Sequence, residues 1–482
     1  MKILFAASEV APFVKTGGLA DVAGSLPAAL AAHGHDIRVV LPLYSDIAEE
    51  WREQMTFVNH FHFPLSWRNS YCGLFQLKRG DVTYYFVDNE YYFKRHSLYG
   101  HFDDGERFAY FSRAVIELPN QLDWAPDIIH CNDWQTGLIP IYLLEARHRF
   151  ACLAETKSVF TIHNIEYQGR YDKVILGDVF GLDQSYFRED MLSYYGDVNL
   201  TKGAIYAADY VTTVSPTYAK ELQYSFYAHG LEGVISDNYY KISGILNGLD
   251  VQQNNPALDP VLAVPYSPDD LTGKAFCKAA LQQECGLEPV PDVPIIACIS
   301  RLVSHKGYDL ITAAFPKMME HNVQFVILGT GDWGIEAFFR NAAKRYPGRV
   351  SANLLYSAKL SSQIYAGADL LLMPSISEPC GLSQMIAMRY GTVPIVRLTG
   401  GLKDSVPSYN PTTGEGLGFT FGNITAGDML SAVDRALALY ETDQPKWKQL
   451  MKKGMQVDLS WDKSASAYEE IYRKLCHCDG ES

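Results

Sequence analysis

The chain is 482 residues long and 48% hydrophobic, which is enough to build large cores in two or three domains. Its 41 Lys and Arg against 55 Asp and Glu give a formal net charge of -14, which disfavours nucleic acid and anionic membranes as partners. Apolar runs stay shorter than the roughly 18 residues of a membrane span, and the N-terminus is a strand without the apolar core of a signal peptide. Nine cysteines without regular spacing agree with a reducing compartment, so we expect a cytoplasmic protein.

The first half of the chain alternates strands and helices. Apolar segments without polar alternation predict strands over residues 3–7, 36–41, 82–87, 127–130, 158–163, 210–214 and 241–246. A helix after the first strand is predicted by the spacing of Leu19, Val22, Leu26 and Leu30, and Gly34 fits its C-cap. Residues 50–100 are aromatic-rich and less regular. Continuous apolar strands separated by helices are typical of a parallel sheet covered on both faces.

The second half repeats the pattern, with strands predicted over residues 295–299, 325–328, 350–355, 370–373 and 394–396. A proline-rich stretch, residues 254–294, lies between the two series and contains one short helix over 271–285. A final helix is predicted over 464–475, after Trp461. The sequence therefore predicts an α/β fold of two doubly wound, Rossmann-like domains facing a central cleft at the carboxyl ends of their sheets.

A threonine followed by two glycines occurs twice between a strand and a helix. The two copies are Lys15-Thr16-Gly17-Gly18-Leu19 and Leu398-Thr399-Gly400-Gly401-Leu402. Glycine lets backbone N–H groups approach an anion, and a helix N-terminus adds partial positive charge. Taken alone, each copy is better explained as a tight βα turn in which glycine relieves strain. Lys15, a point charge beside the first copy, favours a phosphate-binding function.

Polar side chains also follow several of the predicted strands, where doubly wound folds bind ligands. Any one of them has a structural explanation as a helix cap, a turn residue or a solvated charge. Their common position at strand ends favours a ligand site instead. The residues are Asp133, His163, Asn164, Asn247, Arg301, Lys306, Glu378, Cys380 and Gly381.

Two further motifs suggest other chemistry. Cys476-His477-Cys478 offers three metal ligands but no fourth nearby, so we expect no metal site. The segment from Gly329 to Gly334 matches GxGxxG, which would indicate an NAD-dependent oxidoreductase. However, it follows the second strand of its unit rather than the first, and the next strand leads to Tyr356 rather than to a ribose-binding acid.

The ordered set of motifs closely resembles bacterial glycogen synthases and starch synthases, a family of retaining glycosyltransferases with the two-domain GT-B architecture. The resemblance spans nearly the whole chain. It rests on the Ser8-Glu9-Val10, Lys15-to-Val22, Asn132-Asp133-Trp134, Thr161-to-Asn164, Val214-to-Ala219, Leu246-to-Asp250, Ser300-Arg301-Leu302, Lys306-Gly307, Glu378-to-Leu382, Arg389-Tyr390-Gly391 and Thr399-to-Leu402 segments.

This resemblance implies glucosyl transfer from ADP-glucose to the nonreducing 4-hydroxyl of an α-1,4-glucan such as glycogen or a maltooligosaccharide, with no cofactor besides the ADP-glucose co-substrate. It implies an acceptor-side domain over residues 1–250, a linker over 251–294 and a nucleotide-sugar-binding domain over 295–460. Residues 461–482 are expected to form a helix and tail that pack back on the N-terminal domain.

The family's residue roles fall on matching positions of this chain. Catalytic functions are expected for Glu378, His163, Asp21, Arg301 and Lys306. Arg301 and Lys306 would stabilise the departing diphosphate as fixed cations. Glu378 would either offset positive charge on the sugar ring or orient the ring, rather than attack it. Substrate contacts are expected from Lys15, Gly17, Gly18, Tyr99, Asp133, Asn164, Asn247, Tyr356, Cys380, Gly381, Thr399, Gly400 and Gly401.

The sequence departs from the family's pattern at a few positions. Ile386 stands where many retaining relatives carry a second glutamate, so a ribose contact from this side chain is not expected. Gln135 replaces a histidine common after Asp-Trp. Two alternatives to the ADP-glucose enzyme stay open at this point, besides the oxidoreductase. One is the same chemistry with UDP-glucose. The other is a noncatalytic glucan-binding protein, in which some of the 31 tyrosines supply sugar-stacking surfaces while most belong to the core.

Overall fold

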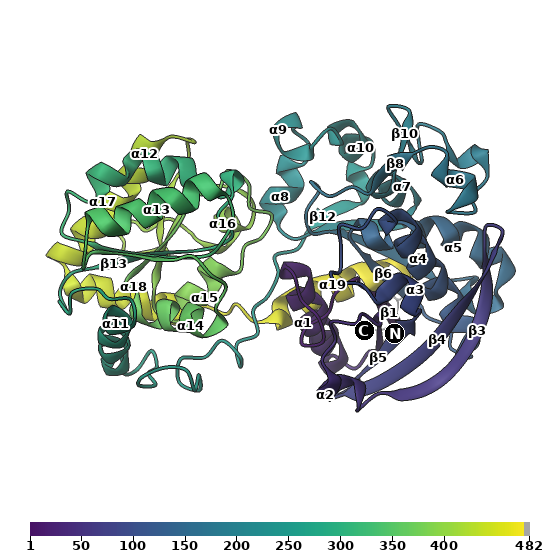
Figure 1. The fold of residues 1–482 in the computed structure, drawn as a ribbon, viewed down its shortest axis with the longest axis horizontal. Helices are drawn as coiled ribbons and strands as arrows, with labels where there is room; N and C mark the ends of the chain where they lie inside the picture. Colours follow the sequence, from purple (N-terminus) through teal and green to yellow (C-terminus); the bar gives the residue numbers. More distant parts are fainter. Residues whose placement is uncertain (477–482) are drawn as a thin grey trace. The chain divides into compact units, whose positions relative to one another are not determined.

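The structure, a computed structural model, describes residues 1–476. By their internal contacts the residues form two compact units (Figure 1). The N-terminal unit consists of Met1–Gly248 together with the described residues that follow Ser460, and the C-terminal unit is Leu249–Ser460. The C-terminal helix therefore belongs to the first unit although it follows the second in sequence.

The N-terminal unit is built on a nine-stranded sheet in the order β12-β11-β7-β6-β1-β2-β5-β4-β3. The pairs from β12 to β5 are parallel, and β5, β4 and β3 pair antiparallel at one edge. The parallel strands are β1 (Lys2–Ala6), β2 (Asp36–Pro42), β5 (Val82–Asp88), β6 (Ile128–Asn132), β7 (Lys157–Ile162), β11 (Tyr210–Thr213) and β12 (Ile242–Gly244). The chain order reverses between β1 and β6, which makes this the topological switch point of the sheet.

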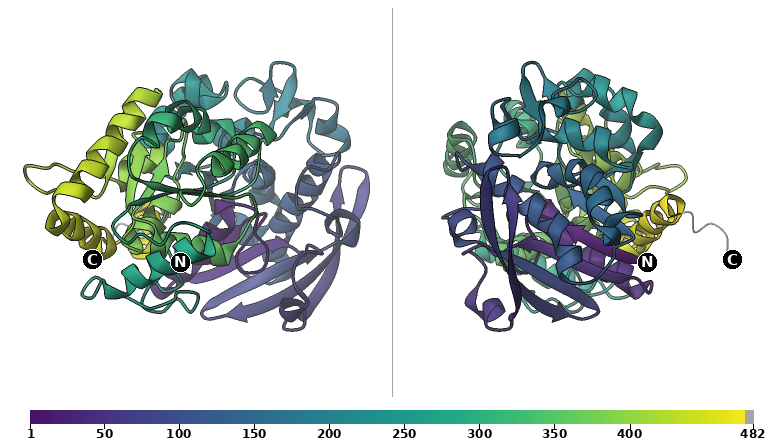
Figure 2. Two further views of the ribbon diagram at one scale, coloured as in Figure 1. Left: turned by 60° about the vertical axis from the view of Figure 1, so that its left-hand side comes forward. Right: turned by 90° about the vertical axis from the view of Figure 1, so that its right-hand side faces the viewer.

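The aromatic-rich region that looked irregular in sequence is a long hairpin of β3 (Thr56–Leu65) and β4 (Arg68–Arg79), drawn as long arrows in Figure 2. Phe61, Phe63 and Leu65 are buried on one face of β3 while the residues between them are exposed. One face of this antiparallel hairpin is exposed to solvent, so its strands lack the continuous apolar runs of the buried parallel strands and are not predicted by such runs. A small antiparallel sheet of β8 (Arg170–Asp172), β9 (Ser193–Tyr194) and β10 (Asp197–Asn199) was also not predicted.

Helices cover the N-terminal sheet. They are α1 (Gly18–Ala32), α2 (Glu49–Arg52), α3 (Glu90–Phe93), α4 (Asp104–Gln121), α5 (Leu138–Arg149), α6 (Ile175–Asp178), α7 (Leu200–Ala207), α8 (Pro216–Glu221), α9 (Ser225–Ala228), α10 (Glu232–Asp237) and α19 (Trp461–Leu475). Gly34, with φ of 87°, ends α1 as expected.

The last helix, α19, begins at Trp461, three residues before the predicted start, and packs against α1 (Figure 1). His33 at the end of α1 bonds Asp462 at 2.8 Å and Glu469 at 3.2 Å. A Cβ on Gly248 would lie 2.5 Å from the Trp461 Cα, so glycine is needed where α19 joins the unit.

The C-terminal unit has a six-stranded, all-parallel sheet in the order β15-β14-β13-β16-β17-β18. Its strands are β13 (Ile295–Ile299), β14 (Gln324–Leu328), β15 (Val350–Asn353), β16 (Leu370–Met373), β17 (Val393–Arg397) and the unpredicted β18 (Phe419–Phe421). This is the strand order of a Rossmann fold, and the direction of winding reverses between β13 and β16. Ligands bind at the carboxyl ends of strands at such a switch point.

Helices lie on both faces of this sheet (Figure 1). They are α11 (Thr272–Glu284), α12 (Tyr308–Met318), α13 (Trp333–Arg345), α14 (Ala358–Gly367), α15 (Ser383–Arg389), α16 (Gly400–Ser405), α17 (Ala426–Thr442) and α18 (Gln444–Gln456). Phe315 of α12 and Phe339 of α13 pack with buried strand residues such as Ile327 in one core. The apolar strands thus fold as predicted because both of their faces are covered.

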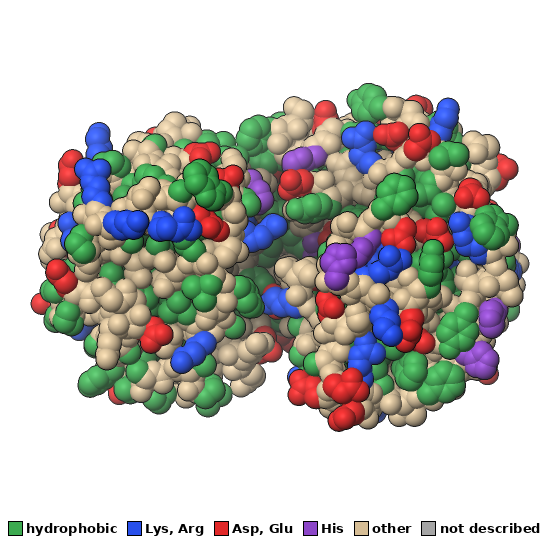
Figure 3. Space-filling view, in the orientation of Figure 1, with side chains coloured by type: hydrophobic (Ala, Val, Ile, Leu, Met, Phe, Trp, Pro, Cys, Tyr) green, Lys and Arg blue, Asp and Glu red, His purple; other side chains and the backbone are tan. Residues whose placement is uncertain are grey.

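Within residues 1–476, no helix combines the length and the apolar character needed to cross a membrane. The face shown in Figure 3 carries acidic and basic side chains interspersed rather than in one broad basic surface.

Candidate functional site

The switch point of the C-terminal unit holds a buried ion pair. Lys306 Nζ lies 2.6 Å from Glu378 Oε2, and the Ser375 hydroxyl donates to the same oxygen at 2.9 Å. Glu378 is 6% exposed, so water does little to screen this pair. A carboxylate and an ammonium are therefore held side by side where the fold is expected to bind its ligand.

The local chain explains how Lys306 reaches Glu378. Lys306 ends a short 3₁₀ turn, Ser304–Lys306, after β13, and Gly307 follows in a left-handed conformation with φ of 79°. A Cβ on Gly307 would lie 2.0 Å from the Pro374 carbonyl oxygen, and Ile376 N donates to His305 O at 2.8 Å. The turn after β13 therefore rests directly on the segment after β16, and Gly307 makes this close approach possible.

Arg301 and Tyr356 also follow strands of this sheet. Arg301 comes two residues after β13, its side chain is exposed, and no side chain or carbonyl of residues 1–476 bonds its guanidinium. Tyr356 lies beyond β15 with 86% of its surface exposed. Both side chains are thus accessible to a ligand, although the described contacts join neither of them to Lys306 or Glu378.

The loop between β16 and α15 carries Glu378 and is called the Glu378 loop below. The second Thr-Gly-Gly turn supports this loop rather than presenting a free amide. A Cβ on Gly400 would lie 2.0 Å from Glu378 O, and one on Gly401 would lie 2.2 Å from Cys380 O. Gly401 N donates to the carbonyls of Glu378 and Pro379, each at 3.1 Å, so this amide is already used within the protein. These glycines let α16 contact the loop closely. This agrees with the structural explanation of the motif, in which glycine permits a tight βα turn.

The remaining residues predicted in this region lie in or beside the same loop. Cys380 is buried, and Gly381 is left-handed with φ of 74°. Gln384 holds the loop by donating to the carbonyls of Cys380 at 3.2 Å and Gly381 at 2.9 Å. Thr399 is buried at the N-cap of α16.

The GxGxxG segment does not present the free amides that a dinucleotide needs. A Cβ on Gly329 would lie 1.9 Å from Ser300 O, and one on Gly331 would lie 2.3 Å from Leu302 O. Gly331 N donates to Glu336 Oε1 at 3.0 Å, and Asp332 caps the start of α13 with its own carboxylate. The glycines therefore serve close packing against the segment that carries Arg301, and the oxidoreductase interpretation fails.

The first Thr-Gly-Gly turn, in the N-terminal unit, is open. Glu9 Oε2 accepts bonds from both the backbone N and the hydroxyl of Thr16, each at 2.6 Å, and fixes the turn. Desolvation by burial raises the pKa of Glu9. The nearest atom to a Cβ on Gly17 is Glu9 Oε1 at 3.6 Å, and a Cβ on Gly18 meets nothing within 4 Å. Protein packing does not require glycine at position 18, which leaves room for a ligand at the start of α1.

Lys15 and Asp21, which flank this turn, form an ion pair of 2.6 Å between Nζ and Oδ1. Their side chains are 48% and 32% exposed. Each of the two lysines predicted to meet the donor thus has a carboxylate partner within its own unit.

A neutral histidine lies at the ends of β6 and β7. Asn132 Nδ2 donates to Ala6 O at 3.0 Å, so its Oδ1 accepts from His163 Nε2 at 2.9 Å. This arrangement places the proton on Nε2 and leaves Nδ1 as an acceptor. Burial lowers the pKa of His163 to about 3. His163 is therefore a neutral hydrogen-bonding group rather than an acid at physiological pH.

Asp133 joins the same cluster. Its carboxylate accepts from His163 N at 2.7 Å and from the backbone N–H of Asn164, yet burial raises its pKa to about 7. Its backbone has a positive φ of 57°, which is uncommon for a residue other than glycine. Asn164 Oδ1 accepts from Glu166 N at 3.0 Å.

Tyr99 and Asn247 complete the predicted set in the N-terminal unit. The hydroxyl of Tyr99 lies 2.8 Å from that of Ser8, just after β1. Asn247 Oδ1 is buried and bonds no partner within residues 1–476.

Four residues that sequence reasoning did not assign shape these sites: Glu9, Asn132, Ser375 and Arg397. Arg397, at the end of β17, donates from Nε to Ser375 O at 2.8 Å and also bonds Ile376 O. Glu9, Asn132 and Ser375 lie at or just beyond the ends of β1, β6 and β16. The position at a strand end could have indicated them, whereas their partners depend on tertiary structure.

No cluster of three or more His, Cys, Asp and Glu side chains within residues 1–476 is arranged to hold a metal ion. Of the Cys476-His477-Cys478 motif, the last two residues lie outside the described part of the chain.

Two protein families match the chain, one in each unit. Residues 2–237 match the starch synthase catalytic domain, and residues 286–449 match glycosyl transferases group 1. Among solved structures, the catalytic domain of starch synthase IV from Arabidopsis thaliana, bound to ADP and acarbose, is 37% identical with a TM-score of 0.91 and covers 98% of this chain and 99% of its own. A sucrose-phosphate synthase from Thermosynechococcus elongatus, 18% identical with a TM-score of 0.62, shares the fold.

Curated relatives extend the similarity over the full length. The glycogen synthase of Geobacillus thermodenitrificans is 50% identical over 476 residues, which cover 98% of each chain. The glycogen synthase of Bacillus cereus is 47% identical over 475 residues, 98% of this chain and 100% of its own. The chain therefore belongs to the glycogen and starch synthase family and is a glycosyltransferase with the GT-B fold.

Proposed function

We propose that this chain elongates an α-1,4-glucan by transferring glucose from ADP-glucose to the nonreducing 4-hydroxyl, with retention of configuration. The names of its full-length relatives, all glycogen synthases, support the glucan product. The plant neighbour bound to ADP and acarbose supports an adenine nucleotide and an oligosaccharide as ligands.

The observation that carries this proposal is the Lys306–Glu378 pair at the switch point of the C-terminal unit. Breaking the bond between glucose C1 and the diphosphate oxygen leaves positive charge on the sugar and negative charge on the diphosphate. Lys306 and the accessible Arg301 are cations that stabilise the diphosphate. Glu378 is a carboxylate within 2.6 Å of Lys306 that offsets the sugar's positive charge.

Retention follows if the acceptor attacks from the side on which the diphosphate leaves. The C1–O bond to the diphosphate breaks, the acceptor O4 bonds to C1, and the proton of the 4-hydroxyl passes to the departing diphosphate. Glu378 Oε2 is bonded by both Lys306 and Ser375, which lowers its nucleophilicity and supports an electrostatic function.

Most residues of the N-terminal unit have binding functions in this proposal, and Asp21 and His163 have catalytic ones. Lys15 and the open Gly17-Gly18 turn contact the sugar nucleotide. Asp21 and neutral His163 contact sugar hydroxyls. The sugar subsites are lined by Tyr99, Asp133, Asn164 and Asn247.

In the C-terminal unit the exposed ring of Tyr356 stacks on the adenine. The loop around the glucosyl group is shaped by Cys380, Gly381, Thr399, Gly400 and Gly401. The functional domains we propose are 1–250 for the acceptor side and 295–460 for the nucleotide sugar, joined by 251–294 and completed by 461–482.

We place this activity in the cytoplasm. No disulfide bond links cysteines within residues 1–476, which supports a reducing compartment.

The direct test measures incorporation of labelled glucose into glycogen with ADP-glucose and, separately, with UDP-glucose. We expect much higher kcat/KM with ADP-glucose and an α-1,4-linked product. A preference for UDP-glucose would change the donor but keep the reaction class. Glycogen binding without incorporation from either donor would favour a noncatalytic glucan-binding protein.

A further inference from the structure

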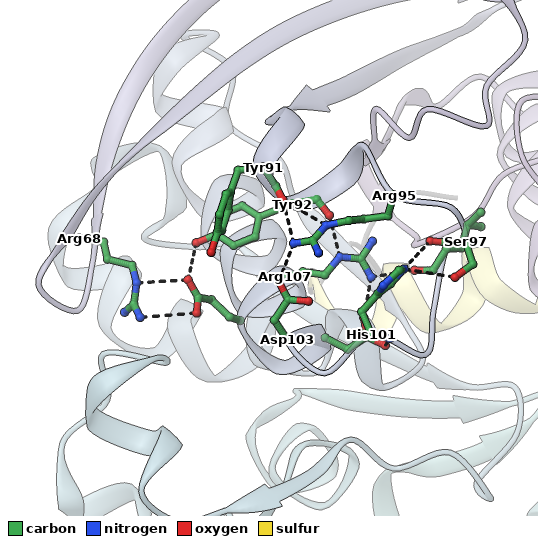
Figure 4. A network of polar contacts seen from close by, with 11 residues as sticks. Arg68, Tyr91, Tyr92, Arg95, Ser97, His101, Asp103 and Arg107 are labelled. Carbon is green, nitrogen blue, oxygen red and sulfur yellow. Dashed lines mark hydrogen bonds and ion pairs between the residues drawn. The ribbon is translucent and has the colours of Figure 1, made fainter.

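One buried ion pair on α4 forms hydrogen bonds to the backbone on both sides of Tyr99. Arg107 is fully buried, and its Nη1 lies 2.5 Å from Asp104 Oδ1. Both residues are on the first turns of α4, and Figure 4 shows Arg107 among the residues of the segment from Tyr91 to His101. Because Tyr99 belongs to this segment, contacts between the ion pair and the segment affect the position of Tyr99.

The contacts of Arg107 hold the chain before Tyr99. Its Nε donates to Tyr92 O at 2.7 Å, and its Nη1 donates to Leu98 O at 3.0 Å. These two bonds tie carbonyls six residues apart to a single guanidinium, whose planar, fixed geometry suits such a task.

The contacts of Asp104 hold the chain after Tyr99. Its Oδ2 accepts from Gly100 N at 2.8 Å and from His101 N at 3.2 Å. The peptide groups immediately before and after Tyr99 are therefore fixed by two side chains that are paired with each other. This leaves the Tyr99 side chain little freedom except rotation about its own bonds.

The same face of α4 also supports the Tyr99 ring. Asp104, Arg107 and Phe108 are spaced i, i+3 and i+4, so they share one side of the helix. The Phe108 ring centroid lies 6.0 Å from that of Tyr99 and 5.2 Å from that of Trp134, the neighbour of Asp133. Tyr99 is thus aimed so that its hydroxyl reaches Ser8 at 2.8 Å.

Stability alone does not account for this network. Arg107 Nη2 is buried without a hydrogen-bond partner within residues 1–476. A buried guanidinium with an unsatisfied nitrogen costs stability, and apolar side chains of similar volume often replace such pairs without loss. An arginine at this position is better explained by the two carbonyls and the carboxylate that it orients.

We propose that Arg107 and Asp104 are positioning residues for glucosyl transfer, which act by holding Tyr99 at the sugar subsite. The inference rests on the proposed function. Lysine at position 107 keeps the charge but cannot bond two carbonyls and a carboxylate in one plane. Asparagine at 104 offers an acceptor to the amides of Gly100 and His101 or to Arg107, but not to both sides.

The test measures kcat and KM for Arg107→Lys and Asp104→Asn, each in the wild-type and the Tyr99→Ala background. We expect kcat to fall about 10- to 100-fold in the wild-type background, the scale typical of a misplaced active-site group. In the Tyr99→Ala background the same substitutions should change kcat less than about twofold, because the residue that they position is gone. Equal losses in both backgrounds would overturn the proposal.

Arg95→Lys is the matched control. Arg95 belongs to the same segment and pairs with Asp103 at 2.7 Å, but it bonds Tyr91 O rather than the peptides beside Tyr99. We expect this variant to keep wild-type kcat.

Hydrogen exchange gives a readout that needs no activity. The amides of Gly100 and His101 should exchange about tenfold faster in Arg107→Lys and Asp104→Asn than in Arg95→Lys. Unchanged exchange would contradict the proposal, as would a failure of both variants to fold, which would mark the pair as structural. Absence of transfer by the wild type would contradict the proposed function, whereas the exchange result would still decide whether the pair orders this segment.

Discussion

Lys306 and Glu378 follow the two strands at the switch point of the C-terminal sheet, and their charged atoms lie 2.6 Å apart. The pair is formed in the free protein, so a diphosphate that binds Lys306 must compete with or reorganise the contact to Glu378. The same relationship occurs in the N-terminal unit, where Lys15 Nζ lies 2.6 Å from Asp21 Oδ1. In both units a lysine expected to meet the donor is thus paired with a carboxylate in the free protein.

Replacing either cation of the C-terminal unit should reduce catalysis strongly. Lys306→Ala and Arg301→Ala are each expected to lower kcat roughly 10²–10³-fold, the usual cost of one fixed charge-stabilising group. The double variant should lose less than the product of the two factors, because both groups act on the same leaving diphosphate. Lys344→Ala, at an exposed lysine of α13, is the control. Near-wild-type kcat at saturating donor in either single variant would exclude that residue from the assignment.

The two Thr-Gly-Gly turns should respond differently to alanine. Gly401→Ala places a Cβ 2.2 Å from Cys380 O, so we expect a lower unfolding temperature and a disturbed Glu378 loop. Gly18→Ala meets no protein atom within 4 Å, so the protein should fold normally while ADP binds more weakly. Thermal unfolding and calorimetric titration with ADP measure both effects. A stable Gly401→Ala protein, or unchanged ADP affinity in Gly18→Ala, would contradict the different functions assigned to the two turns.

Lys15 and Asp21 should matter for binding rather than for folding. An ion pair as exposed as this one contributes at most about 1 kcal/mol to stability. Lys15→Met is therefore expected to keep the wild-type unfolding temperature and to raise the KM for ADP-glucose about tenfold, as expected for loss of a charged hydrogen bond. Asp21→Asn releases Lys15 from its partner and should not weaken ADP binding. If Lys15→Met lowered the unfolding temperature and left KM unchanged, Lys15 would be a structural residue.

Stability should fall on acidification because of buried neutral histidines. His130 on β6 is fully buried, bonds the Tyr472 hydroxyl and Thr161 Oγ1 at 2.6 Å each, and has its pKa lowered by burial to about 3. Below its ordinary pKa of 6.5 the unfolded chain takes up a proton that the folded chain does not, so stability decreases as pH falls from there towards about 3.

The variant that isolates this effect is His130→Gln. It should be less stable than the wild type at about pH 7.5, and its unfolding temperature should fall less between about pH 7.5 and about pH 5.5. His163 keeps part of the pH dependence in both proteins. Equal pH slopes for the two proteins would exclude His130 as a source of the acid sensitivity.

The parallel strands were predictable because both of their faces are buried, which produces continuous apolar runs such as Ile295–Ile299. The hairpin β3–β4 was not predictable, since one of its faces is exposed to solvent and its aromatic residues lie on both faces. The start of α19 at Trp461 depends on the close contact with Gly248, which joins residues more than two hundred positions apart.

The candidate site was predictable in its residue types but not in its pairings. The sequence placed Lys306 and Glu378 beyond strands that proved to be neighbours in the sheet, yet their ion pair depends on Gly307 resting on Pro374. The repeated Thr-Gly-Gly motif looked equivalent in sequence. Only tertiary contacts distinguish the open Gly18 from Gly401, whose amide is bonded to the Glu378 loop.

The most direct test of this account is Glu378→Gln, with kcat, ADP affinity and covalent labelling measured on one preparation. Glutamine keeps the shape of the side chain but removes the charge that pairs with Lys306 and that we propose offsets the sugar's positive charge. We predict a roughly 10²–10³-fold lower kcat, ADP binding at least as tight as in the wild type, and no glucosyl adduct on wild-type Glu378 by mass spectrometry after treatment with a fluorinated donor. Unchanged kcat with a raised KM would contradict the electrostatic function, and a trapped adduct on Glu378 would replace it with nucleophilic catalysis.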